Sequence, residues 1–76
     1  MNPNAQQRQS VLKTLYAARE AEPKAGWLTD HELKQAHGPA DFALAVLEEL
    51  GHLKRDGYRT RITGAGVLAC EAATCN

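Results

Sequence analysis

A helical pattern that passes directly into a hairpin pattern lies between residues 47 and 66, and it constrains the fold more than any other feature. Leu47 and Leu50 fall near one face of a helix. The Asp56-Gly57 pair that follows is a two-residue turn signal, and the alternating run from Tyr58 to Ile62 is typical of a strand. We therefore expect a helix followed at once by a small antiparallel hairpin.

The N-terminal third of the chain predicts one long helix and one short extended segment. Residues 5–21 have a helical pattern whose apolar stripe includes Leu12 and Leu15. The helix should end before Pro23, because a proline pushes the preceding residue out of the α region. The apolar pair Trp27-Leu28 is long enough for one ladder contact with the later hairpin, and Trp27 is expected to pack in the core.

A capping box opens a second helix. The Thr29 side chain can accept from the backbone of Glu32, whose carboxylate can reach back to the N–H of Thr29. This short helix should stop at His37-Gly38-Pro39. A third helix is expected over residues 40–50, with an inner face formed by Ala43, Val46, Leu47 and Leu50.

The last predicted helix covers residues 65–73, with Thr63 as its cap. Val67, Leu68 and a buried Cys70 are expected to hold it to the core. The predicted fold is thus mainly α with a small antiparallel β-hairpin. We expect one domain, residues 5–73, between a flexible N-terminus (1–4) and a flexible C-terminus (74–76).

Composition argues against several classes of protein. The chain of 76 residues is 43% apolar, enough for one core. No apolar run approaches the roughly 18 residues of a membrane span, and no secretory signal opens the chain, so we expect a cytoplasmic protein. Cys70, Cys75 and the three histidines lack metal-ligand spacing, and the carboxylates form no catalytic arrangement. We expect no metal, no cofactor and no enzymatic activity.

The charge is distributed unevenly along a chain whose formal net charge is zero. Residues 30–50 carry five carboxylates against Lys34 alone, a net charge of −4. Residues 54–61 carry four cations against Asp56 alone, a net charge of +3. A neutral protein therefore has an acidic middle and a cationic hairpin.

Two short segments resemble the winged helix-turn-helix family, in particular small bacterial and phage regulators of the multiple-antibiotic-resistance-like type. Residues 47–53 (LEELGHL) look like the end of that family's recognition helix, and residues 62–66 (ITGAG) are similar to the sequence that closes its wing. The resemblance covers roughly residues 10–72. It implies the order helix, short strand, helix, helix, hairpin (the wing), helix, and homodimerisation through the first and last helices.

The resemblance also implies that residues 40–50 lie in the major groove of duplex DNA while the hairpin touches the flanking backbone. Here the outward stripe has no Lys, Arg, Asn or Gln, the usual base readers. The leading hypothesis is therefore a transcriptional regulator that contacts DNA mainly through its hairpin, with modest help from the second helix and from Arg8 or Lys13 of the first. The predicted DNA-binding residues are Lys34, Gln35, Lys54, Arg55, Arg59 and Arg61.

Two alternatives stay open. The hairpin cations can instead form a solvated face that keeps the sheet edge from pairing with other chains. The third helix can instead bind a protein through an acidic and apolar surface, formed by Asp41, Phe42, Leu44, Ala45 and Glu48. In the simpler interpretation, Phe42 closes the core and Tyr58 packs against the other hairpin strand.

Overall fold

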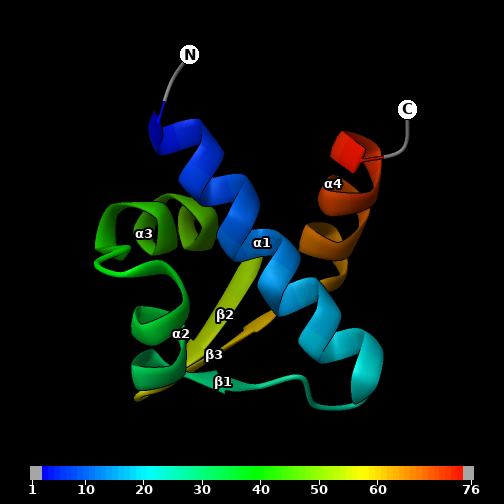
Figure 1. The fold of residues 1–76 in the computed structure, drawn as a ribbon. Coiled ribbons are helices and arrows are strands. Elements are labelled where there is room, and N and C mark those ends of the chain that lie inside the picture. Colours follow the sequence, from blue (N-terminus) through cyan, green and yellow to red (C-terminus); the bar gives the residue numbers. More distant parts are fainter. Residues whose placement is uncertain (1–2, 75–76) are drawn as a thin grey trace.

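The computed structural model describes residues 3–74, which form four helices and three short strands (Figure 1). Their order is α1 (Pro3–Ala21), β1 (Leu28–Thr29), α2 (Asp30–His37), α3 (Asp41–Glu49), β2 (Leu53–Asp56), β3 (Arg59–Ile62) and α4 (Gly64–Thr74). The predicted mainly helical architecture with a small antiparallel sheet is confirmed. α1 begins at Pro3, two residues earlier than expected. The expectations for residues 1–2 and 75–76, Cys75 included, fall outside the described residues.

The predicted capping box is present at the start of α2. The N–H of Glu32 donates to the Thr29 hydroxyl at 3.1 Å, and the N–H of Thr29 donates to the Glu32 carboxylate at 3.0 Å. These bonds satisfy two backbone donors that a helix start otherwise leaves unpaired. The Thr29 hydroxyl also donates to the Glu32 carboxylate at 3.1 Å. The pKa of Glu32 is lowered, first by the backbone N–H of Thr29 and then by this hydroxyl. The end of β1 and the start of α2 are therefore joined without a loop.

The three strands form one antiparallel sheet in the order β1-β3-β2. Asp56 pairs with Arg59, so the two turn residues are Gly57 and Tyr58 rather than the predicted Asp56 and Gly57. Gly57 has φ +63°, as a type II′ turn requires at its first central position. Tyr58 lies in this turn and is 70% exposed, so the prediction that it packs against the partner strand is wrong.

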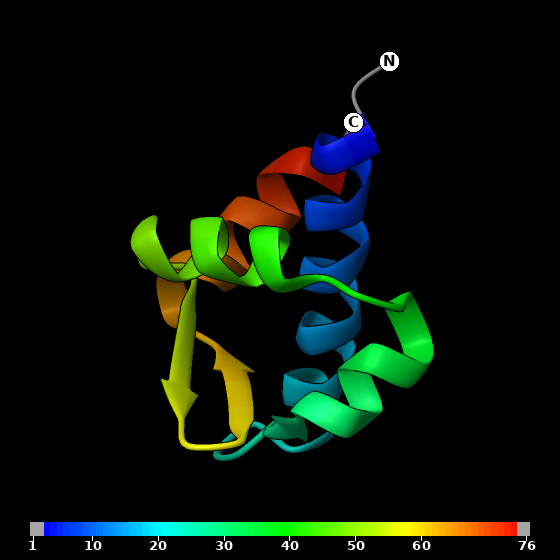
Figure 2. The ribbon, with the colours of Figure 1, turned by 90° about the vertical axis from the view of Figure 1, so that its left-hand side faces the viewer.

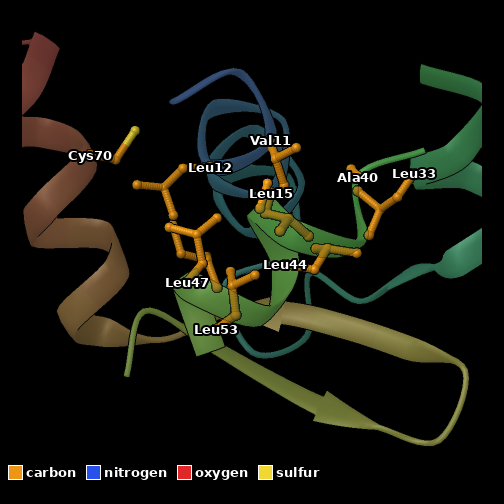
Figure 3. Close-up of a cluster of buried hydrophobic side chains, with 11 residues drawn as sticks. Val11, Leu12, Leu15, Leu33, Ala40, Leu44, Leu47, Leu53 and Cys70 are labelled. Atoms are coloured by element: carbon orange, nitrogen blue, oxygen red, sulfur yellow. The ribbon is translucent and has the colours of Figure 1, made fainter. Parts of the chain in front are cut away.

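One buried apolar cluster joins the helices to the sheet (Figure 3). Val11, Leu12 and Leu15 of α1 face Leu44 and Leu47 of α3 in this cluster. The remaining members are Leu33, Ala40, Ala43, Leu53, Ile62 and the predicted Cys70. Burial raises the pKa of the Cys70 thiol. α1 is the central element, since it packs against α2, α3, α4 and β3.

The hairpin formed by β2 and β3 is covered on one side only. Figure 1 places α1 in front of the hairpin, and Figure 2, turned by 90°, shows no helix on the hairpin's far side. The N–H of Asp30 donates to the carbonyl of Tyr58 at 2.8 Å, which joins the hairpin turn to the start of α2. The domain therefore presents one open face of a three-stranded sheet to solvent.

Three apolar side chains lie outside the core, contrary to prediction. Leu50 is 58% exposed because α3 ends at Glu49 and the chain turns away at Gly51 (φ +80°). Leu68 is 68% exposed, since α4 is apolar almost all round and its pattern does not define an inner face. Phe42 is 59% exposed and points away from the buried side of α3, so it does not close the core.

Candidate functional site

The open face of the sheet carries three of the four predicted hairpin cations. Thr60 and Ile62 are fully buried on the inner face. Because side chains alternate along a strand, their neighbours Arg59 and Arg61 must lie on the outer face. The register places Lys54 directly opposite Arg61 on this same face. We call the group of Trp27, Lys54, Arg59 and Arg61 the cationic sheet face.

Trp27 lies beneath the two arginines of this face. The Cζ atom of Arg59 is 4.4 Å from the centroid of the indole ring, and that of Arg61 is 5.6 Å away. Both distances fall within the range of a cation–π interaction. Trp27 is partly exposed rather than buried in the core, so its predicted core role is wrong.

Like charges face each other across the two strands of the hairpin. Lys54 and Arg61 are cross-strand partners, an arrangement that costs stability because the two side chains repel. Arg59 is compensated, since it forms an exposed ion pair with Asp56 at 3.1 Å. Within residues 3–74, the Lys54 side chain forms no ion pair. The face thus keeps a net charge of about +2 when Asp56 is counted with its three cations.

Arg55 lies on the other side of β2 from this face. Its guanidinium contacts both carboxylate oxygens of Asp30, at 3.1 and 3.3 Å. The two residues line a cleft of about 180 Å³ between α2, the start of α3 and the hairpin, together with Lys34 and Asp41. Two positive and two negative side chains therefore line the cleft. Arg55 therefore joins the hairpin to α2 by an ion pair.

Five of the six predicted DNA-binding residues consequently form two groups. Lys54, Arg59 and Arg61 lie together on the sheet face, whereas Lys34 and Arg55 line the mixed-charge cleft. Gln35 is exposed on α2, beside Lys34 in the sequence. Trp27 was not predicted as part of a site. The position of Trp27 follows from the strand pairing alone, because the pairing of Leu28 with Thr60 places residue 27 opposite residue 61.

The predicted protein-binding surface on α3 is largely exposed. Asp41, Phe42, Ala45 and Glu48 face solvent, and Glu49 lies beside them. Leu44 does not belong to this surface, since it is only 7% exposed and packs in the core. The physical reason is its position between Ala43 and Leu47 on the inner side of the helix. We call the five exposed residues the acidic α3 face: Asp41, Phe42, Ala45, Glu48 and Glu49.

The two segments that carried the family resemblance meet at one junction. The Thr63 hydroxyl donates to the carbonyl of Gly51 at 2.6 Å, and the Thr63 N–H donates to the carbonyl of His52 at 2.9 Å. Thr63 also caps α4 by accepting the N–H of Gly66 at 3.1 Å. The Cα of Gly66 lies so close to the His52 carbonyl that a Cβ would overlap it. These residues therefore fix the base of the hairpin.

A second, more apolar concavity lies beside the contact between α1 and α4. It has a volume of about 620 Å³ and is lined by residues that include Tyr16, Pro23, Val67 and the exposed Leu68. The Tyr16 hydroxyl donates to the Glu71 carboxylate at 2.8 Å, which raises the pKa of Tyr16. The groove carries no cluster of cations.

Within residues 3–74, no group of three or more His, Cys, Asp or Glu side chains is placed to hold a metal ion. None of the helices in this range has the length and apolarity needed to cross a membrane. Comparison with family models, curated proteins and solved structures yielded no significant match.

Proposed function

We propose that this chain is a small DNA-binding protein of the winged helix-turn-helix type, a cytoplasmic transcriptional regulator that contacts duplex DNA mainly through its hairpin. One observation carries the proposal: Lys54 and Arg61 face each other as like charges on the open face of the sheet. Such a pair opposes folding, and an anionic partner would relieve the repulsion. The order of helices and strands agrees with the resemblance of residues 47–53 and 62–66 to this family.

Phosphate contacts, rather than base contacts, would supply the affinity. Guanidinium and ammonium groups bind phosphate oxygens and release counterions from the duplex. The acidic α3 face exposes Asp41, Glu48 and Glu49, which repel phosphates and offer no donor to guanine or adenine. We therefore expect weak, strongly salt-dependent binding with little sequence preference.

Titration of the 15N-labelled protein with a short DNA duplex at low salt tests this function. Amide shifts should concentrate in residues 54–61 and in β1, and should disappear as salt is raised. The absence of shifts at sub-millimolar DNA overturns the proposal.

Arg55 provides a matched control for Arg61. Each substitution to Ala removes one positive charge from the hairpin, but only Arg61 lies on the cationic sheet face. Arg61→Ala should weaken binding about three- to tenfold and lower the slope of log K against log salt by about 0.9. Arg55→Ala should leave the slope unchanged. Equal effects of the two substitutions would place the contact elsewhere on the hairpin.

A protein-binding role of α3 is the second candidate. The observation in its favour is that Phe42 is 59% exposed among three carboxylates, as in surfaces that dock a basic, partly apolar partner. Glu48→Lys separates the two functions: it should strengthen DNA binding about three- to tenfold, because one repelling charge becomes attractive. If α3 instead binds a protein, the same change should weaken that complex.

The resemblance further predicts a homodimer through α1 and α4. The groove beside Leu68 lies between these helices and supports this arrangement. Light scattering at several protein concentrations tests it: a monomer mass at the highest concentration rejects a stable dimer.

A further inference from the structure

Trp27 occupies a position fixed by the sheet register. β1 pairs Leu28 with Thr60 and Thr29 with Arg59, so the residue before β1 lies opposite Arg61 and diagonally across from Arg59. The distances from the Cζ atoms of Arg59 and Arg61 to the ring centroid, 4.4 Å and 5.6 Å, agree with this placement. One aromatic ring is therefore shared by two guanidinium groups on adjacent positions of one face.

A guanidinium that lies over a ring presents its flat face to the ring and leaves the N–H groups of its edge to other partners. In Arg59 one Nη2 N–H already donates to Asp56 at 3.1 Å, and the other donors stay available. A planar guanidinium carries five N–H donors around its rim, and these match the oxygens of a phosphate. A free arginine side chain has many rotamers and loses that freedom when it binds. A ring that already restrains the guanidinium reduces this loss.

Building on the proposed DNA-binding function, we propose that Trp27 is a positioning residue that holds Arg59 and Arg61 side by side for neighbouring phosphates of one DNA strand. Trp27 acts through the arginines and donates no contact to a base. The DNA-contacting surface is then the cationic sheet face. Arg55 is excluded because it lies on the other side of β2, opposite the buried Thr60.

The salt dependence of DNA binding separates positioning from direct contact. In Trp27→Leu both arginines remain able to reach phosphates, so the slope of log K against log salt should stay unchanged. At every salt concentration the affinity for DNA should be about three- to tenfold lower than that of the wild type. Arg61→Ala, in contrast, removes a phosphate contact and should lower the slope itself.

A double-mutant cycle tests whether Trp27 acts through the arginines. In the Arg59→Ala/Arg61→Ala background, Trp27→Leu should cause no further loss of affinity. The same loss in both backgrounds, or no loss in the wild-type background, overturns the positioning role while DNA binding by the protein stands. A wild-type protein that does not bind the duplex at low salt overturns both proposals.

A third variant guards against a simple folding defect. Trp27→Phe keeps an aromatic ring for the guanidinium groups and should retain more affinity than Trp27→Leu. Amide spectra of the free variants report whether the sheet is intact, and the 15N relaxation of the arginine side chains reports their mobility. Arg59 and Arg61 should become more mobile in Trp27→Leu while Arg55 does not. Unchanged mobility of Arg59 and Arg61 contradicts the proposal.

Discussion

Gly66 in the first turn of α4 lies directly against the carbonyl oxygen of His52, and a Cβ at position 66 would overlap that oxygen and the side chain of Ile62. Gly66→Ala should therefore lower the free energy of unfolding by about 1–3 kcal/mol, because the start of α4 must move away from the base of the hairpin. Urea unfolding measures the change.

Gly64, in the same turn of α4, is the control for this substitution. A Cβ there meets no atom within 4 Å, and its φ is not positive. Gly64→Ala should be neutral or stabilising by up to about 1 kcal/mol through higher helix propensity. Similar losses at both positions would show that the contact with His52 is not the cause.

Replacing the buried Thr60 by valine should stabilise the protein. The Thr60 side chain is fully buried, and its hydroxyl has no hydrogen-bond partner among the described residues. Thr60→Val keeps the shape and removes the buried polar group, so the free energy of unfolding should rise by about 1 kcal/mol. Thr63→Val is the matched comparison, because it removes a cap and a bond to Gly51 and should cost about 1–3 kcal/mol. Thermal unfolding of both variants checks the opposite signs.

The lowered pKa of Glu32 predicts that the protein loses stability in acid. The pKa of Glu32 in the folded protein lies below the ordinary value of 4.5. Its contribution is therefore complete above that value and is lost as the pH falls through the lower, folded value. Glu32→Gln should be less stable than the wild type at about pH 7, and the difference should become smaller at an acidic pH below 4.5. Urea titrations at the two pH values measure this, with Glu22→Gln as a control for an exposed carboxylate. A difference that persists undiminished at the lower pH would exclude a charge-dependent cause.

Reversing the charge of Lys54 should have opposite effects on folding stability and on DNA affinity. Lys54→Glu turns a repulsive cross-strand pair with Arg61 into an attractive one and should raise the free energy of unfolding by about 0.2–1 kcal/mol. The same change places a carboxylate on the cationic sheet face and should lower DNA affinity more than tenfold. Chemical denaturation and fluorescence anisotropy on a labelled duplex give the two values. A variant that is both more stable and tighter binding would argue against this face as the contact.

Local sequence patterns were sufficient to predict most elements of the fold. Thr29 with Glu32, and Thr63 before α4, are caps whose bonds span three residues, so a short window contains all the information. The same holds for the glycine in the hairpin turn. The position of the turn was wrong by one residue because its register depends on pairing along two strands.

Short sequence windows did not predict which apolar side chains at the ends of helices are buried, nor which charged side chains form pairs. Leu50 and Leu68 satisfy the apolar pattern, but whether they are covered depends on where neighbouring elements end. Arg55 pairs with Asp30 across 25 residues of sequence, and Trp27 meets Arg59 only once β1 joins the sheet. The sequence therefore identified the cations but not which of them share a face.

The hairpin is fastened at both of its ends. The Thr63 hydroxyl holds its base to Gly51, and the carbonyl of Tyr58 holds its turn to the start of α2. A hairpin attached only at its base can rotate relative to the rest of the domain. In this protein the contacts with α2 and α4 together fix the angle of the hairpin. The open face of the sheet therefore has a fixed orientation relative to α2 and α4, and a molecule that docks on it meets a surface whose angle these helices determine.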